Sequence, residues 1–108
     1  MKQGVIINIG YHNIGKNKPF PNITPYAIAK NGILIYSMTL SQILKQQKKK
    51  IRVNIISPGF MVNSKIRIKP IKQIGKKKPY IEHRKIIETI KKIINNENLN
   101  NKNIIIEN

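Results

Sequence analysis

Two side chains capable of acid–base chemistry lie four residues apart near the start of an expected helix. Tyr26 and Lys30 would share one helical face, because side chains spaced by four residues come together there. An ammonium group beside a phenol favours the phenolate, and it would lower the tyrosine pKa from about 10 toward neutrality. Such a tyrosine can donate or accept a proton at a carbonyl or alcohol oxygen. About 0.7 such pairs are expected by chance at this lysine and tyrosine content, so a surface tyrosine with a solvated lysine is the alternative.

A second candidate, Gly10–Asn17, approximates a phosphate-binding loop. It reads GYHNIGKN after an apolar run, whereas a triphosphate-binding loop requires G-x-x-x-x-G-K followed by Ser or Thr. Asn17 replaces the hydroxyl that would hold magnesium, and Pro19 and Pro21 prevent a helix from following at once. The sequence therefore argues against a triphosphate site here.

The sequence gives little support for a cysteine-based site, a metal site or a membrane span. The chain has no cysteine, which excludes a disulfide framework and a cysteine nucleophile. His12 and His83 are far apart and have no carboxylate cluster nearby, so we expect no metal site. No apolar run approaches the ~18 residues of a membrane span, and Met1–Gly4 lead into a strand rather than a signal peptide. We expect a cytoplasmic protein with no membrane partner.

The elements that must position the candidate side chains alternate between strand and helix. Three short apolar runs are expected to form strands: Val5–Ile9, buried on both faces, Arg52–Ile56 and Ile104–Ile106. Two segments with helical periodicity are expected to form helices: Pro25 to about Gln47, with Thr24 as the N-cap, and the stretch around Ile86–Ile94. Long loops are expected from Tyr11 to Thr24 and from Phe60 to Tyr80. This βαβαβ order predicts an α/β fold with parallel strands between layers of helix.

The high content of Ile, Lys and Asn offers a second explanation for the strongly positive net charge. Of 108 residues, 25 are Ile, 18 are Lys and 14 are Asn, and the formal net charge is +17. A surface this basic is typical of nucleic-acid-binding proteins, and a non-enzymatic protein of that class is the alternative function. All three favoured residues have codons rich in A and T, so coding drift also accounts for the charge. The runs Lys48–Lys50 and Lys76–Lys78 lack interleaved aromatic residues for base stacking, which disfavours a nucleic-acid partner.

Two further motifs flank the tyrosine–lysine pair and favour a functional interpretation of it. The run Ile6–Ile9 (IINI) precedes the pair, and Ile51–Gly59 (IRVNIISPG) follows it. In this order and at these separations the three motifs resemble the short-chain dehydrogenase/reductase family. In that family a strand I-[IV]-N-I precedes a helix with Y-x-x-x-K, and a strand ending in P-G follows it. The resemblance extends over residues 4 to 107, with 3-oxoacyl-acyl-carrier-protein reductase-like and pteridine reductase-like branches as the nearest.

The resemblance implies an NAD(P)-dependent oxidoreductase that moves a hydride between a nicotinamide and a small carbonyl or alcohol substrate. It makes Tyr26 the catalytic acid or base, and it makes Lys30 the residue that depresses the tyrosine pKa and binds the nicotinamide ribose. Pro58 and Gly59 match the turn against the nicotinamide, where a missing side chain lets the backbone approach. Ser64 is a further cofactor candidate. The cofactor would be NAD or NADP, and the complete enzyme would be a homo-oligomer.

Two departures from the family pattern bear on activity. The serine that orients the substrate oxygen is missing, and its expected positions hold Asn13 and Tyr11. Asn13 is the candidate at the serine position, and Tyr11 and His12 are other possible donors.

The glycine-rich turn for the pyrophosphate and the acidic residue for the adenosine ribose are missing as well. We therefore expect residues 1–108 to be the C-terminal half of a Rossmann-like, doubly wound parallel sheet in a three-layer α/β/α arrangement. The N-terminal half would be absent, the chain would be inactive alone, and one flank of its sheet would be exposed.

Overall fold

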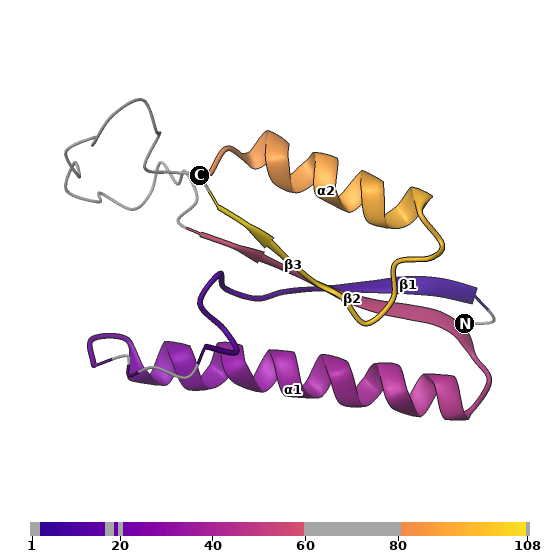
Figure 1. Ribbon diagram of the computed structural model, residues 1–108, viewed down its shortest axis with the longest axis horizontal. Helices are drawn as coiled ribbons and strands as arrows, with labels where there is room; N and C mark the ends of the chain where they lie inside the picture. The colour runs from indigo at the N-terminus through magenta and orange to yellow at the C-terminus, as the bar shows by residue number, and fades with distance from the viewer. Residues whose placement is uncertain (1–2, 17–18, 20, 60–80, 108) are drawn as a thin grey trace.

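The computed structural model describes residues 3–16, 19, 21–59 and 81–107 (Figure 1). Within them, three strands form one parallel sheet in the order β1-β2-β3, namely Gln3–Ile9, Lys50–Pro58 and Asn103–Ile106. Two helices, α1 (Thr24–Gln46) and α2 (His83–Asn95), lie on opposite sides of this sheet (Figure 1). The predicted βαβαβ order, the parallel pairing and the three-layer arrangement are confirmed.

Strand β2 is the centre of the sheet and of the core. It pairs with β1 along the whole of β1 and with β3 near its own carboxyl end. Its residues from 53 to 58 are buried, whereas β1 is only half-buried and Ile9 is exposed. The prediction that Val5–Ile9 is buried on both faces is wrong. Among the described residues nothing pairs with the outer edge of β1, as expected for an exposed flank, and α2 packs mainly against β2.

Helix α1 begins one residue before its predicted start. Ile23 is the N-cap residue, and its carbonyl oxygen accepts a hydrogen bond of 2.8 Å from the Ala27 amide. Thr24 is therefore the first helical residue and not the predicted N-cap. Pro25 suits the first turn, because the amide hydrogen it lacks would have no intrahelical acceptor there.

Two polar side chains of β2, Arg52 and Asn54, hold the segment that leads from α2 to β3. The Arg52 guanidinium donates through Nη1 to the carbonyl oxygens of Asn96 and Leu99, at 3.0 and 2.8 Å. The Asn54 side chain is fully buried, donates to the Leu99 carbonyl at 2.8 Å and accepts from the Lys102 amide at 3.1 Å. Both side chains point to the same face of the sheet because they are two residues apart in a strand. These hydrogen bonds guide the chain back to β2, where it pairs as β3.

No helix among the described residues has both the length and the apolar composition needed to cross a bilayer. The loop predicted from Phe60 to Tyr80 lies outside the described residues.

We predict that Arg52→Ala lowers the free energy of unfolding by about 1–3 kcal/mol, because it removes the donor for carbonyl oxygens at the end of α2. Urea denaturation followed by far-ultraviolet circular dichroism measures the loss. The matched control is Arg84→Ala, since Arg84 is exposed and lies 3.7 and 3.9 Å from carboxylate oxygens of Glu82 and Glu88. The control should change stability by less than about 0.5 kcal/mol. Equal losses in the two variants would contradict the role assigned to Arg52.

Candidate active site

The candidate acid–base residues gather at the edge of the sheet where the parallel strands end. Helix α1 starts at this edge, so its first turns, with Tyr26 and Lys30, lie beside the end of β1 (Figure 1). The carboxyl ends of β2 and β3 reach the same edge because all three strands run in parallel. Open α/β sheets bind their ligands at this edge, which makes it the place to look for a site.

Lys30 lies against the ring of Tyr26. Its ammonium nitrogen is 5.7 Å from the centre of that ring, which is within range of a cation–π interaction. The same nitrogen donates a hydrogen bond of 3.2 Å to the carbonyl oxygen of Ile9, the last residue of β1. The structure thus brings the predicted pair together and ties it to the end of the strand.

The pKa of Tyr26 is raised above its usual value of 10.0. Partial burial of the phenol is the larger cause, and the neighbouring phenol of Tyr11 adds to it. The expectation that Lys30 depresses this pKa is wrong for the chain as it folds here. The Lys30 ammonium lies over the ring and is hydrogen-bonded to the Ile9 carbonyl, and it does not lower the pKa of the phenol.

The segment that follows β1 brings further polar side chains to Tyr26. The Tyr11 ring meets the Tyr26 ring edge to face, with centroids 5.3 Å apart and planes at 78°. The His12 ring packs against Tyr11 with a centroid distance of 4.5 Å. Asn13, at the predicted serine position, donates from Nδ2 to the Tyr11 hydroxyl oxygen at 3.3 Å. Asn13 therefore acts on Tyr11, and Tyr11 is the residue that contacts the Tyr26 ring.

Pro58 and Gly59 lie at the end of β2, next to the same segment. The Pro58 carbonyl oxygen accepts a hydrogen bond of 3.1 Å from the His12 amide. A Cβ atom at Gly59 would lie 3.3 Å from Cδ1 of Ile81 and 3.5 Å from Nδ1 of His12, so little room exists for a side chain. The structure thus gathers Tyr26, Lys30, Asn13 and the Pro58–Gly59 turn at one edge, while Ser64 lies outside the described residues.

The contact between Tyr11 and Tyr26 is the part of the site that sequence reasoning missed. The two residues are separated by a proline-containing loop without periodicity, and no spacing rule applies across such a loop. The signal present in the sequence was that Tyr11 occupies one of the two positions expected for the family's serine, directly after Gly10.

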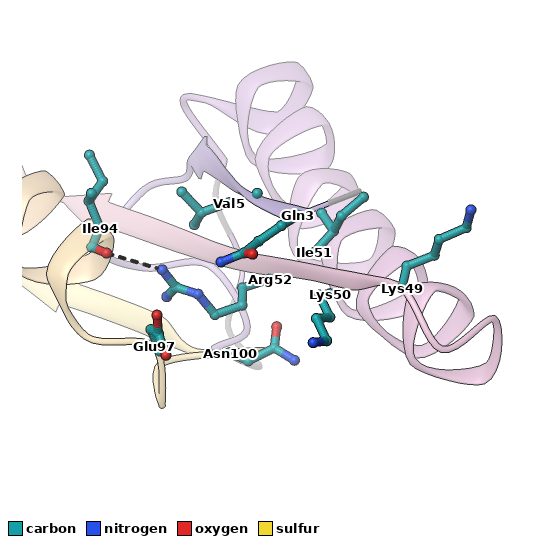
Figure 2. A pocket seen from close by; sticks show the side chains of 10 residues that line it. Gln3, Val5, Lys49, Lys50, Ile51, Arg52, Ile94, Glu97 and Asn100 are labelled. Carbon is teal, nitrogen blue, oxygen red and sulfur yellow. Dashed lines mark hydrogen bonds between the residues drawn. The ribbon is translucent and has the colours of Figure 1, made fainter. Parts of the chain in front are cut away.

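A hollow of about 490 Å³ opens at the opposite edge of the sheet, where the strands begin (Figure 2). It is lined by residues of β1, of the turn into β2 and of the end of α2. Arg52 in this hollow donates through Nη2 to the Ile94 carbonyl at 3.4 Å, as Figure 2 shows. The described residues that line it include no tyrosine, histidine or serine for proton transfer, so we place the candidate active site at the other edge.

Metal-ligating side chains do not cluster in the part of the chain that the structure describes. No three His, Cys, Asp or Glu residues come together there in a way that could hold an ion. The described side chains at the candidate site carry phenol, ammonium, imidazole and amide groups.

A protein-family model described as short chain dehydrogenase matches residues 1–73, which include β1, α1 and β2. No curated protein matches the chain.

Solved structures share the fold over nearly the whole chain. The 3-hydroxyacyl-CoA dehydrogenase type-2 from Mycobacterium avium is 18% identical, with a TM-score of 0.77, and the match covers 97% of this chain and 42% of that one. A short chain dehydrogenase from Burkholderia cenocepacia J2315, solved with NADP, is 16% identical with a TM-score of 0.74. The match covers 95% of this chain and 44% of that one. A 4-hydroxyisoleucine dehydrogenase solved with NADH is 21% identical with a TM-score of 0.72. The match covers 94% of this chain and 44% of that one. The chain thus spans less than half the length of the structures it matches.

The raised pKa of Tyr26 predicts how stability responds to alkaline pH. The phenol of Tyr26 ionises at lower pH in the unfolded chain than in the folded chain. The contribution of this group to the free energy of unfolding is therefore fully present below a pH of about 10 and is lost as the pH rises above it. We expect Tyr26→Phe to lose less free energy of unfolding than the parent chain between about pH 8 and about pH 11 in urea denaturation. Tyr36→Phe is the control, because Tyr36 is 61% exposed on the same helix, and it should follow the parent. If Tyr26→Phe also followed the parent, the assigned environment of Tyr26 would be wrong.

Proposed function

The chain belongs to the short-chain dehydrogenase family, and we propose that it provides the catalytic half of an NAD(P)-dependent oxidoreductase acting on carbonyl or alcohol groups. The observation that carries this proposal is the contact of Tyr26 with Lys30 at the carboxyl edge of the sheet, with the tyrosine 45% exposed. A phenol in such a place can exchange a proton with a substrate oxygen. Structures of similar fold solved with NADH and with NADP support a nicotinamide cofactor.

The residues of this chain fit the nicotinamide end of such a cofactor. In the proposal, Lys30 binds the nicotinamide ribose, the Pro58–Gly59 turn lies against the ring, and Ser64 adds a polar contact. The place of this turn at the carboxyl edge of the sheet, where ligands of open α/β sheets bind, supports the assignment.

The pyrophosphate end finds no counterpart in this sequence. Its six glycines, at positions 4, 10, 15, 32, 59 and 75, form no glycine-rich turn that opens a helix. We propose that this cradle belongs to a complementary N-terminal half, whose strand would pair with the outer edge of β1. Residues 1–108 would then form the C-terminal half of one NAD(P)-binding domain.

In the proposed mechanism Tyr26 carries the proton. The nicotinamide, when bound, supplies the hydride-transfer chemistry. A tyrosine whose pKa is at or above its usual value is protonated at neutral pH, so Tyr26 is in the state that donates a proton to a carbonyl oxygen during reduction. Asn13 takes the serine position and acts through the Tyr11 hydroxyl, to which it donates at 3.3 Å. Because that hydroxyl oxygen accepts from Asn13, its own hydrogen remains available for a substrate oxygen beside Tyr26.

We further propose that the complete enzyme is a homo-oligomer that uses the outward face of α1. Ile28, Ile35 and Tyr36 on this face are 68%, 66% and 61% exposed. The sequence contains 21 Lys and Arg residues, yet α1 has only two lysines and no acidic residue. An apolar face with little charge suits contact with a second copy of itself, even in a chain of net charge +17.

The proposal predicts that the chain alone has no measurable oxidoreductase activity and binds NADPH more weakly than micromolar. The physical reason is that the groups that would hold the pyrophosphate and the adenosine are missing from its sequence. A titration that follows NADPH fluorescence measures the affinity, and micromolar binding would contradict the proposal.

The positive test joins this chain to the segment encoded upstream of Met1 in its genome, provided that a strand, a glycine-rich turn and a helix are encoded there. The joined protein should reduce a carbonyl compound with NADPH or NADH, and Tyr26→Phe should lower kcat by about 10²- to 10⁴-fold. Lys45→Ala, at an exposed position at the far end of the same helix, is the control and should leave kcat unchanged. Full activity in Tyr26→Phe, or the lack of any such upstream segment, would overturn the proposal.

A further inference from the structure

The segment that carries Tyr11, His12 and Asn13 is attached to β2 by its backbone. The Gly10 amide donates to the Ile56 carbonyl at 2.8 Å, and the His12 amide donates to the Pro58 carbonyl at 3.1 Å. These two bonds continue the pattern of parallel pairing beyond the end of β1. They fix the segment to the sheet, but they leave its position relative to α1 undetermined.

Two consecutive turns then lead the segment toward α1. The Ile14 amide donates to the Tyr11 carbonyl at 2.9 Å, and the Lys16 amide donates to the Asn13 carbonyl at 3.3 Å. Gly15, the third residue of the second turn, has a φ of +78°, a conformation that glycine adopts without strain. A Cβ atom on Gly15 would lie 3.1 Å from Cδ2 of Leu34, so the backbone passes close to α1 at this point.

At this close approach, Asn31 of α1 makes hydrogen bonds with both halves of its side-chain amide. Its Oδ1 accepts from the Gly15 amide at 2.8 Å, and its Nδ2 donates to the Ala27 carbonyl one helical turn earlier at 2.8 Å. The bond to Ala27 orients the side chain so that Oδ1 faces Gly15. Asn31 directly follows Lys30 and lies five residues after Tyr26, so it acts on the turns of the helix that carry the candidate acid–base pair.

We propose that Asn31 is a positioning residue of the candidate active site, which holds the segment after β1 against α1 and thereby keeps the Tyr11 ring on the Tyr26 ring. Its relevance to catalysis rests on the proposed function, whereas its effect on the site can be measured without cofactor or substrate. Asn31 touches neither reacting group itself. It acts through Gly15, whose amide is the only described backbone donor of the segment bonded to α1.

The proposal has a consequence for Tyr26 that a purely structural role would lack. Tyr11 contributes to the raised pKa of Tyr26, and the two rings are in contact at 5.3 Å. If Asn31 no longer holds Gly15, the segment keeps its bonds to β2 but loses this bond to α1, so the Tyr11 ring should lie less closely on the Tyr26 ring. The pKa of Tyr26 should then move down toward its usual value of 10.0.

The test compares Asn31→Ala with the parent chain by nuclear magnetic resonance. We expect the Gly15 amide to exchange its hydrogen roughly fivefold faster or more, as the loss of one hydrogen bond implies. We also expect the Tyr26 ring, labelled with carbon-13, to titrate at lower pH. Alanine is a better helix former than asparagine, so the variant retains α1, which circular dichroism checks.

Two further variants sharpen the test. Asn31→Asp keeps an oxygen acceptor for the Gly15 amide but loses the donor to the Ala27 carbonyl, so the protection of the Gly15 amide should fall between that of Asn31→Ala and that of the parent chain. Gln42→Ala replaces an exposed polar residue of the same helix and should change neither readout. Unchanged exchange at Gly15 and unchanged titration of Tyr26 in Asn31→Ala would overturn the proposal. Because these readouts use the chain alone, they are independent of whether the joined protein reduces a carbonyl compound.

Discussion

Parallel pairing along β2 is the constraint on which the rest of the structure depends. Because β1 and β3 both run parallel to β2, all three strands end at the same edge of the sheet. The segment after β1, the Pro58–Gly59 turn and the first turns of α1 therefore come together, although they are separated in sequence. The side chains of Arg52 and Asn54 support this arrangement by guiding the chain from α2 into β3. The candidate site is a consequence of strand direction, and its chemistry depends on which residues lie at that edge.

The sequence predicted what depends on local periodicity. The order of strands and helices, the approximate bounds of each element and the helical spacing of Tyr26 and Lys30 were all accessible from patterns of two and 3.6 residues. The burial of β1 could not be predicted, because the apolar run Val5–Ile9 does not reveal whether a helix covers each face of the strand, and α2 packs mainly against β2. The N-cap prediction failed for a related reason, since Thr24 and Ile23 differ by one residue and only the backbone decides between them.

The electrostatics of the site could not be predicted from two residues alone. The pair Tyr26 and Lys30 indicates a depressed tyrosine pKa only if the ammonium outweighs every other influence on the phenol. In the folded chain, burial and Tyr11 act in the opposite direction, and Lys30 lies against the ring while bonded to the Ile9 carbonyl. Tyr26 therefore stays protonated at neutral pH, as a tyrosine of ordinary pKa does. The loop after β1, which has no periodicity, thus contributes through Tyr11 to the raised pKa of a residue on the helix, while burial of the phenol is the larger cause.

The central claim is that this chain holds the nicotinamide side of a dinucleotide site and lacks the adenosine side. Its most direct test is a nuclear magnetic resonance titration of the chain with nicotinamide mononucleotide and, separately, with adenosine monophosphate. We expect nicotinamide mononucleotide to shift the resonances of Tyr26, Lys30 and Gly59, and adenosine monophosphate to leave them unchanged. Shifts caused by nicotinamide mononucleotide only around the hollow at the opposite edge, near Lys50 and Arg52, or stronger binding of adenosine monophosphate at Tyr26, would contradict the claim.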